Sequence, residues 1–375
     1  MSKPIRKTIG KYIDVLTDYH SNGSYESLRD NVTLLDKKDY AIMIRTLNFE
    51  RNDFTDDLIF VDKKAYEYLS KSVVLPNDIL TNKIANPGSI YIMPDLGCPV
   101  TCGMNLFLIR FSADVNQRYM YYCMKNSEAY IKSFGHGTTT KTITKDELRN
   151  IDLLIHKDKD EQDRIAGLLT NIDKKIDVNK KINNKLQQMA HATYMHLFYK
   201  KHPNGTLGEI IVENSKSTVQ VGKAKNRKGK FPFFTSGDVL LEWNDMMIDG
   251  RNCFLNTGGN AGVKFYIGGA AYSTDTWCIT ATKNLEDYLY LLLLSIKPEL
   301  NQKFFQGTGL KHLQKPLLKD RKIYIPSDSE INDFNSKVQP LMNMISSNTR
   351  ENRYLMGLRD WLLPMLMNGQ VTVNN

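Results

Sequence analysis

The stretch that decides the fold is Gly-Thr-Thr-Thr-Lys-Thr-Ile-Thr-Lys at residues 137–145, because a related stretch, Gly-Thr-Gly-Leu-Lys-His-Leu-Gln-Lys, occupies residues 307–315. The two stretches begin 170 residues apart, and the register continues beyond them, where the strand-like residues 151–155 correspond to residues 321–325. Self-similarity at a fixed offset indicates a duplicated structural unit. With 375 residues the chain is long enough for more than one domain, so the repeat predicts two similar globular domains.

The match also extends upstream of the repeated stretch. Residues 119–134 and 289–304 both carry apolar or aromatic residues at three-to-four spacing, which is typical of a helix. Further upstream, Thr-Ile-Gly at residues 8–10 corresponds to Thr-Leu-Gly at residues 206–208, an offset of 198. Because the offset falls from 198 to 170 along the copy, the first copy carries about 28 extra residues in its early half.

Each copy also contains β-rich runs bounded by Gly, Pro and Asn, the residues that mark turns. We match residues 40–46, 89–93 and 106–111 of the first copy to residues 253–257, 263–267 and 276–280 of the second. The expected fold class is therefore α+β, with two mostly-β domains that each contain a helix near their end.

A long helix is predicted after each globular copy, with seam residues alternately four and three apart, the a/d pattern of a coiled coil. The seam positions are Ile165, Leu169, Ile172, Ile176, Asn179, Asn183 and Leu186 in the first helix, and Phe334, Val338, Leu341, Ile345, Asn348, Asn352 and Leu355 in the second. A polar seam residue lowers stability but penalises wrong registers. The matched asparagines therefore favour an intramolecular antiparallel coiled coil in a fixed register. The alternative is two ordinary amphipathic helices that each lie on their own domain.

The sequence Lys-Lys-His-Pro-Asn-Gly at residues 200–205 breaks the helical pattern and separates the two copies. We divide the chain into a globular domain at 1–157, a spacer helix at 158–200, a second globular domain at 201–327 and a second spacer helix at 328–375. About 40 helical residues span about 60 Å, so the paired helices would form a rigid spacer with an internal pseudo-twofold repeat.

The formal net charge is +9 and the pI is about 9.0, which favours a polyanionic partner. The four segments carry net charges of +2, +2, +6 and −1 in chain order, so the excess lies mainly in the second globular domain. No run of about 18 apolar residues is present, and residues 1–10 lack the apolar core of a signal peptide. We therefore expect a cytoplasmic protein.

The five cysteines are an odd number in a chain expected to be cytoplasmic, so we expect them to be reduced. Cys98 and Cys102 have a spacing that some zinc sites use, but no second Cys or His pair lies nearby. No metal site is predicted.

The arrangement of globular copy, long helix, globular copy and long helix resembles the specificity subunit of type I restriction-modification systems. The resemblance rests on Gly137-Thr138 with Lys141, the strand at residues 148–155, the helix start at residues 160–166 and the C-terminal residues 358–370. It covers essentially the whole chain. The second junction departs from the pattern, because Glu-Ile-Asn at residues 330–332 stands where the first has Asp-Glu-Gln at residues 160–162.

This resemblance implies that each globular copy is a target recognition domain that reads one half of a split site on double-stranded DNA. It also implies that the helices set the gap between the halves and dock two adenine methyltransferase subunits, which restriction subunits can join. Catalysis, both methylation and ATP-dependent cleavage, would belong to those partners. The protein would then be a non-catalytic, nucleoid-associated prokaryotic defence component with no cofactor of its own.

The sequence lacks the motifs of the corresponding enzymes. A DNA adenine methyltransferase needs an Asn/Asp-Pro-Pro-aromatic tetrad, but Asn86-Pro87-Gly88 lacks the second proline and the aromatic residue. The glycine-rich residues 258–262 do not fit a cofactor loop. No nuclease-type cluster of carboxylates with a lysine and no Walker-type loop is present. We therefore predict no catalytic residue, no cofactor and a binding role.

Three groups of residues are candidates for DNA contact. In the repeated loop, Lys141 and Lys311 follow small, flexible residues whose backbone amides can approach phosphates. The group comprises Thr138, Thr139, Thr140, Lys141, Lys311 and His312. The alternative for this loop is a plain surface turn.

The second group is a turn with Asn86 in the first copy and Asn260 in the second, flanked by Lys83 and Lys264, because asparagine can bind adenine in the major groove with two hydrogen bonds. An Asx turn that needs asparagine for its geometry is the alternative. The third group is the basic run with Lys225, Arg227 and Lys228, which binds phosphate or is simply a solvated face. Arg45 is a further candidate.

A function of a different class also fits the repeat. A coiled-coil adaptor could use its two globular copies to bind proteins, and it would purify with partners other than nucleic acid or a methyltransferase. The apolar C-terminal residues at 361–366 are expected to pack on the opposite helix or on a partner subunit, because such a patch is costly when exposed.

Overall fold

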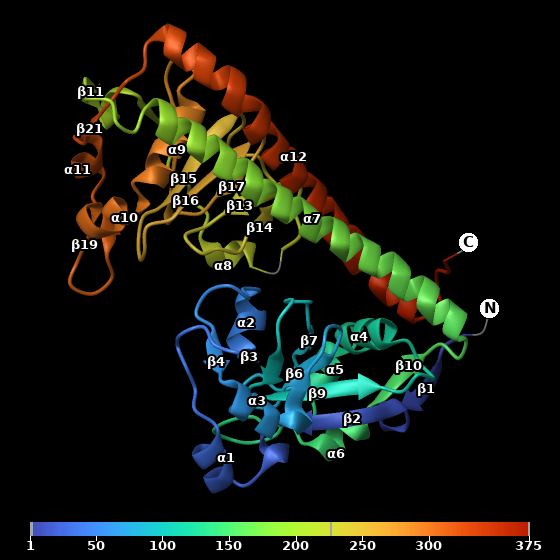
Figure 1. Ribbon diagram of the computed structural model, residues 1–375. Coiled ribbons are helices and arrows are strands. Elements are labelled where there is room, and N and C mark those ends of the chain that lie inside the picture. The colour runs from blue at the N-terminus through green and yellow to red at the C-terminus, as the bar shows by residue number, and fades with distance from the viewer. Residues whose placement is uncertain (1–2, 226, 374–375) are drawn as a thin grey trace. The chain divides into compact units, whose positions relative to one another are not determined.

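The computed structural model describes residues 3–225 and 227–373. It divides into two compact units, residues 1–174 with 355–375 as unit 1 and residues 175–354 as unit 2 (Figure 1). Two long helices, α7 (Lys159–Leu197) and α12 (Asp328–Met367), each contribute residues to both units. We describe each unit separately.

Unit 1 is built around an antiparallel sheet in which the strand order is β2, β9, β6, β7. These strands span Ile13–Asp18, Leu106–Phe111, Ile79–Asn82 and Ile90–Ile92, respectively. A separate pair joins β1 (Ile5–Thr8) to β10 (Asp152–Ile155), and so brings the start of the domain against its end. The helix α4 (Gln117–Asn126) starts at Asn116, whose side chain accepts a hydrogen bond from the Tyr119 amide.

A second sheet of unit 1 has the order β4, β3, β8, β5, and its β3 and β8 are parallel. These strands are Ile59–Val61, Ala41–Ile44, Val100–Cys102 and Val73–Val74. The shorter helices are α1 (Tyr25–Asn31), α2 (Thr46–Arg51), α3 (Lys63–Tyr68), α5 (Glu128–Lys132) and α6 (Lys145–Arg149), with 3-10 turns at Ile9–Tyr12, Tyr19–Asn22 and Ser70–Ser72.

Unit 2 contains an antiparallel sheet in the order β12, β18, β15, β16. Its strands are Ile211–Glu213, Thr276–Ala281, Arg251–Asn256 and Val263–Ile267. A second sheet orders β14 (Leu241–Trp243), β13 (Phe231–Phe234) and β17 (Ala271–Tyr272), with β13 and β17 parallel.

The remaining elements of unit 2 are short, apart from the helix α9. They are the strand pairs β11 (Gly205–Thr206) with β21 (Lys322–Ile323) and β19 (Phe305–Gln306) with β20 (His312–Leu313), and the helices α8 (Val221–Ala224), α9 (Glu286–Ser295), α10 (Lys297–Glu299) and α11 (Lys315–Lys319). A 3-10 turn spans Leu207–Glu209 and a π turn spans Leu300–Phe304.

The strand orders confirm the predicted duplication and the α+β class. The order β2, β9, β6, β7 recurs as β12, β18, β15, β16, the pair β1 and β10 recurs as β11 and β21, and the parallel pair β3 and β8 recurs as β13 and β17. One predicted match is wrong. Residues 253–256 belong to β15, whose counterpart is β6, whereas residues 40–46 contain β3, whose counterpart is β13. The error arose because a β-rich run does not reveal its partner strand.

The long helices complete the core of each unit with their apolar stripes. In unit 1, Ile165 and Leu169 of α7 and Leu366 of α12 are buried in the cluster that contains β9 and α4. In unit 2, Phe334 and Val338 of α12 join the cluster formed by β18 and α9. Of the C-terminal apolar residues, Leu366 is therefore core, whereas Trp361 is exposed.

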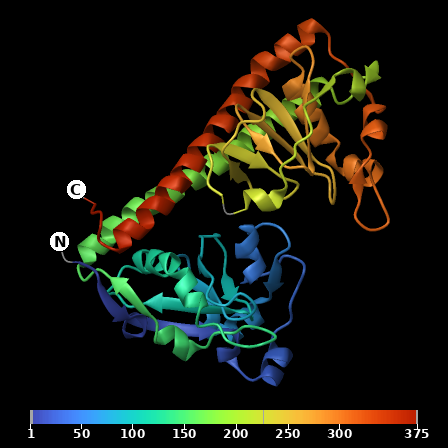
Figure 2. The ribbon, with the colours of Figure 1, turned by 180° about the vertical axis from the view of Figure 1, so that it is seen from behind.

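The antiparallel pairing of α7 with α12 is confirmed in unit 2, where the two helices lie side by side (Figures 1 and 2). The Asn179 amide donates a hydrogen bond of 2.9 Å to Asn352 Oδ1, and the Asn348 amide donates one of 2.8 Å to Asn183 Oδ1. Four residues toward the C-terminus of α7, from Asn179 to Asn183, therefore correspond to four residues toward the N-terminus of α12, from Asn352 to Asn348. Asn352 also donates to the Ile176 carbonyl, 3.2 Å away.

The other predicted seam residues lie at the same face or close to it. Ile172 and Ile176 are buried, and partly buried positions are Asn183, Leu186, Leu341, Ile345, Asn348 and Leu355. In unit 1 the seam ends with a charged contact, where Arg359 Nη1 lies 2.9 Å from Asp173 Oδ1. The helix starts differ as the sequence indicated, because α12 uses a Ser327–Glu330 capping pair and α7 begins with an Asp158 cap.

Replacing Asn352 with alanine should destabilise unit 2 by about 1–3 kcal/mol, because the buried Asn179 amide keeps only its bond to Glu351 and the Ile176 carbonyl loses its bond from Asn352. Urea unfolding measures the change. Asn184→Ala on the exposed side of α7 is the matched control, since it has the same effect on helix propensity without a seam contact. The double variant Asn179→Leu with Asn352→Leu should be at least as stable as wild type, because both partners become apolar. Equal losses for Asn352→Ala and Asn184→Ala would contradict this account.

Candidate nucleic-acid interface

The repeated loop of unit 1 is closed at its base by two backbone hydrogen bonds. The His136 amide donates to the Thr142 carbonyl at 2.9 Å, and the Thr142 amide donates to the His136 carbonyl at 2.8 Å. Gly137 has φ +119°, and a Cβ at this position would lie 2.5 Å from the Thr140 carbonyl oxygen, so the loop requires glycine there. Residues 138–141 form its exposed tip.

This loop packs against the turn between β6 and β7 through backbone groups. The Ala85 amide donates to the Lys141 carbonyl at 3.0 Å, and the Ile143 amide donates to the Lys83 carbonyl at 3.1 Å. Asn86 is exposed beside this junction. The structure therefore brings two of the predicted groups, the tip at residues 138–141 and the Asn86 turn, to one place on unit 1.

Unit 2 builds the same pair of loops. The Gly259 amide donates to the Lys311 carbonyl at 2.9 Å, and the Leu313 amide donates to the Thr257 carbonyl at 3.0 Å. Gly307 has φ +147°, and a Cβ there would lie 2.7 Å from the Leu310 carbonyl oxygen, which repeats the geometry of Gly137. Lys311, His312 and Asn260 are all exposed.

The two loop pairs therefore present the same chemistry in both units. Each offers one lysine on the longer loop and one asparagine on the shorter turn, next to backbone that is held by hydrogen bonds. Lysine provides a cation for phosphate, and the asparagine side chain has the donor and acceptor that match adenine. Because the contacts between the loops are made by backbone, the side chains at their tips are free of internal partners in the described residues.

Two of the predicted DNA-contact lysines are engaged inside the fold. Lys83 Nζ lies 2.7 Å from Asp18 Oδ2, and the Lys83 side chain is only 12% exposed. Lys264 Nζ donates to the Thr235 carbonyl at 2.6 Å, and burial lowers the pKa of Lys264. Both ammonium groups hold chain segments together in this structure, which leaves Lys141 and Lys311 as the exposed lysines of the paired loops.

Arg45 lies apart from the paired loops, before α2. Its guanidinium donates to the Asp57 carbonyl, and its Nε is buried without a partner among the described residues. The Arg45 guanidinium is therefore partly enclosed by the protein. It lines a cavity of about 310 Å³ together with Leu34, Met43, Thr46 and Met104.

The basic run occupies the segment between α8 and β13, where Lys225, Arg227 and Lys228 are exposed. The intervening residue 226 lies outside the described residues. The Arg227 guanidinium lies 5.2 Å from the centre of the Trp243 ring. On the C-terminal side of the run, Arg353 of α12 donates to the Lys230 carbonyl at 3.2 Å and pairs with Glu242. This arginine, which the sequence did not single out, ties the basic segment to the long helix within unit 2.

Other functional candidates were missed because their contacts are distant in sequence. Lys145 and Lys315 occupy the last position of the repeated stretch, but nothing in the pattern indicated that each meets an acidic residue. Asp18 and Glu213, their partners, lie more than 100 residues away from them. The repeat itself was the available signal, since both lysines recur at the offset of 170.

Metal-binding and redox features can be described for residues 3–225 and 227–373. There, no group of three or more His, Cys, Asp or Glu side chains is placed to hold a metal ion. All five cysteines are free thiols, with Cys98 exposed and the others buried. In the same part of the chain no helix has the length and apolar character needed to cross a membrane.

Comparison with known proteins agrees with this architecture. The family model for the type I restriction modification DNA specificity domain matches twice, at residues 25–188 and 200–351. The MjaIX type I restriction enzyme specificity subunit of Methanocaldococcus jannaschii is 22% identical over 363 residues, which cover 84% of this chain and 82% of the relative.

A solved structure gives the same picture of the fold. The S subunit of a type I restriction-modification system from M. genitalium superposes with a TM-score of 0.61 at 16% identity, covering 96% of this chain and 95% of the other. Two matches of the family model account for most of the chain, one for each copy of the repeat. The chain therefore belongs to the type I restriction-modification DNA specificity family, as a specificity subunit whose role is DNA sequence recognition.

Proposed function

We propose that each unit reads one half of a bipartite DNA site through its pair of loops. The observation that carries this proposal is the duplication of the loop pair, with the same backbone hydrogen bonds from Ala85 to Lys141 and from Gly259 to Lys311. One lysine and one asparagine then face each half-site. The other candidates on the repeated loops, Thr138, Thr139, Thr140 and His312, add contacts to phosphates or base edges.

The long helices set the spacing between the two half-sites in this proposal. At 1.5 Å per residue, the 39 residues of α7 extend about 60 Å. The asparagine ladder of unit 2 supports a fixed register, because a shifted helix would leave buried amides without partners. The gap between the half-sites would then be a geometric property of the protein.

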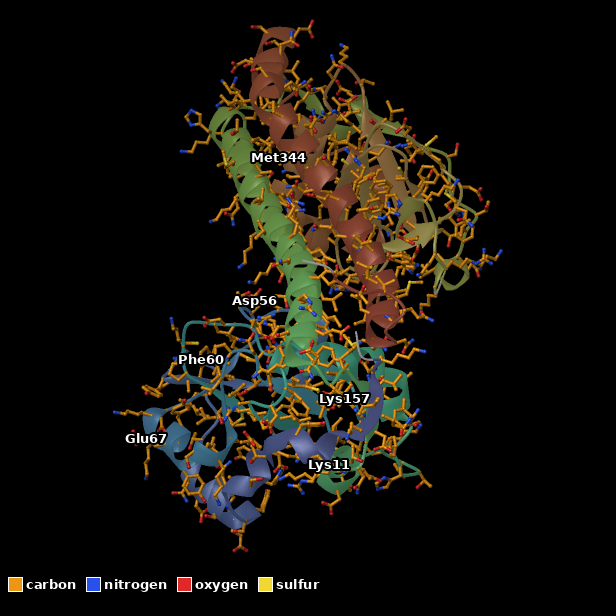
Figure 3. The ribbon with its side chains drawn as sticks, turned by 90° about the vertical axis from the view of Figure 1, so that its right-hand side faces the viewer. Lys11, Asp56, Phe60, Glu67, Lys157 and Met344 are labelled. Carbon is orange, nitrogen blue, oxygen red and sulfur yellow. The ribbon has the colours of Figure 1, made fainter. Side chains whose placement is uncertain are left out.

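The catalytic steps belong to partner subunits. Two adenine methyltransferase subunits would dock on the helices, and restriction subunits would join them to cleave DNA. Exposed apolar side chains on the helices in unit 2 support docking, among them Val178, Met189 and Met344, the last labelled in Figure 3. The four domain and helix segments at 1–157, 158–200, 201–327 and 328–375 remain our proposed functional division, in a cytoplasmic complex.

Methylome sequencing of cells with and without the gene, in the presence of a methyltransferase subunit, tests the function. We expect a bipartite adenine-methylated motif that appears only with the gene. Asn86→Ala should relax the base preference in one half of the motif, and Asn260→Ala should relax it in the other half, since each lost pair of hydrogen bonds costs about 1–3 kcal/mol of discrimination. A continuous motif, or one that either variant relaxes in both halves, would contradict the proposal.

Lys141→Met and Lys311→Met should each weaken DNA binding to all sequences and reduce the magnitude of the salt slope, log K against log salt, by about 1. The reason is that each variant loses one phosphate contact and the counterion it releases. The measurement is a titration of the complex with its methyltransferase at several salt concentrations. Lys63→Met, an exposed lysine on α3, is the matched control and should leave the slope unchanged. Slopes identical to wild type in both loop variants would place the phosphate contacts elsewhere.

A further inference from the structure

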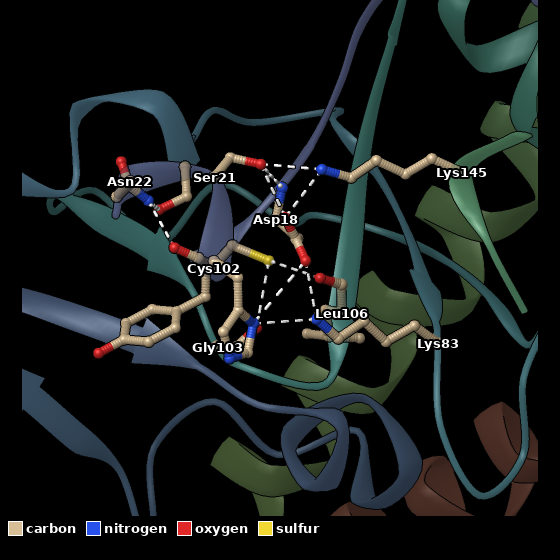
Figure 4. A network of polar contacts seen from close by, with 11 residues as sticks. Asp18, Ser21, Asn22, Lys83, Cys102, Gly103, Leu106 and Lys145 are labelled. Carbon is tan, nitrogen blue, oxygen red and sulfur yellow. Dashed lines mark hydrogen bonds and ion pairs between the residues drawn. The ribbon is translucent and has the colours of Figure 1, made fainter. Parts of the chain in front are cut away.

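A buried carboxylate lies at the base of the loop pair in unit 1 (Figure 4). Asp18 ends β2, and its side chain is only 8% exposed. Its two oxygens accept from Lys83 Nζ at 2.7 Å and from Lys145 Nζ at 2.9 Å, and Ser21 Oγ donates to it at 2.7 Å. A charge this deeply buried needs such partners, because an unpaired one is costly.

The two lysines come from the two segments that carry the loop pair. Lys83 precedes the Asn86 turn, and Lys145 is the first residue of α6, directly after the repeated loop. One carboxylate therefore holds the bases of both segments to the end of β2. Burial by itself raises the pKa of Asp18, but the hydrogen bonds from Lys83 and Lys145 outweigh it and lower the pKa to about 2. The anchor is charged at any physiological pH.

Unit 2 contains a second version of this anchor. Glu213 ends β12, the counterpart of β2, and its carboxylate pairs with Lys315 at 3.7 Å and with Lys319. Lys315 is the first residue of α11, as Lys145 is of α6. The Trp277 indole N–H also donates to Glu213, at 2.7 Å.

An aromatic ring accompanies the lysine in both units. Lys315 Nζ lies 4.7 Å from the centre of the Trp277 ring, and Lys145 Nζ lies 5.8 Å from that of Phe107. Phe107 and Trp277 are 170 residues apart, as are the two lysines. An acid, a lysine and a ring therefore lie together beside the repeated loop in both units, although the acids occupy different strand positions, because Asp18 pairs with Phe107 and Glu213 pairs with Ile279.

The two anchors differ in exposure. The Glu213 side chain is 40% exposed, whereas that of Asp18 is 8% exposed. The backbone position of Lys83 is taken in unit 2 by Thr257, which has no ammonium group. The anchor of unit 1 thus ties two loop segments to one buried acid, and that of unit 2 ties one segment at the surface.

We propose that Asp18 and Glu213 are positioning residues for sequence reading, and that Lys83 serves the Asp18 anchor and does not contact DNA. The inference rests on the proposed function of the loop pairs. Without Asp18, two ammonium groups at the base of the loops lose their counterion and move toward water. The Asn86 turn and the loop tip then shift relative to one another, and base reading requires side chains held within about 0.5 Å of the productive geometry.

The test uses the full chain in complex with its methyltransferase, and DNA libraries in which one half-site at a time is randomised. Asp18→Asn should reduce discrimination in the half read by unit 1 by about tenfold or more and leave the other half unchanged. Glu213→Gln should act on the other half only, with a smaller effect because its anchor is exposed. Asp146→Asn, which removes an exposed acid on α6 itself, is the matched control and should change neither half.

The salt dependence of DNA binding distinguishes an anchoring role of Lys83 from a phosphate contact. Lys83→Met should reduce discrimination in the unit 1 half without changing the salt slope, whereas Lys141→Met should reduce the slope by about 1. Thermal unfolding accompanies each variant. If Asp18→Asn does not fold, Lys145→Met, which removes the hydrogen bonds to Asp18 and Ser21 from a partly exposed position, must show the same half-specific loss.

Distinct outcomes separate the two proposals. Unchanged discrimination in Asp18→Asn, or in Lys145→Met where the first variant does not fold, would overturn the anchor while the bipartite reading by wild type stands. Equal losses in both halves that follow the drop in thermal stability would also overturn it, because the anchor would then only stabilise the fold. A reduced salt slope in Lys83→Met would show that Lys83 contacts phosphate. Absence of bipartite reading by the wild-type complex would instead reject the proposed function.

Discussion

The pairing of asparagine amides between α7 and α12 is the constraint on which the rest of unit 2 depends. In a seam of Ile, Leu and Val, a buried amide without a partner costs about 1–3 kcal/mol. Asn179 meets Asn352 and Asn183 meets Asn348, so these amides are satisfied only when the helices are antiparallel and in one register. The same helix faces supply Phe334 and Val338 to the core beneath the sheet. The register of the helices therefore also fixes where the globular part attaches.

Because the chain is duplicated, the loop glycine, the lysine that follows the loop and the acid that contacts this lysine are each present in both units. Features that both units share are those the fold requires, and features that differ are particular to one unit. Both units require glycine at the start of the loop, because Gly137 and Gly307 hold positive φ and face a carbonyl across the loop. Both place a lysine at the first residue of the following helix and an acid at the end of the first sheet strand. They differ in burial of that acid. The units therefore share a way of holding the loop and differ in how firmly they hold it.

Local patterns in the sequence predicted most of the fold, whereas contacts between distant segments were not predictable from them. The helix spacing gave the seam positions, and the repeated stretch gave the two loops, because both signals lie within a few consecutive turns or residues. Residues 253–257 were matched to the wrong strand, since strand pairing depends on partners that a single run does not identify. For the same reason nothing in the sequence around Lys83 indicated that Asp18, 65 residues away, contacts its ammonium group.

The backbone hydrogen bonds that join the paired loops affect how substitutions can change the DNA sequence that a specificity subunit recognises. Ala85 and Lys141, like Gly259 and Lys311, meet through backbone amides and carbonyls, so their side chains contribute nothing to that junction. A substitution at a loop tip therefore leaves the junction, the glycine turn and the acid–lysine anchor intact. Under the proposed function, stability and sequence preference are consequently carried by different atoms of the same loop. Side chains at the loop tips can then vary over a frame whose free energy of unfolding hardly changes.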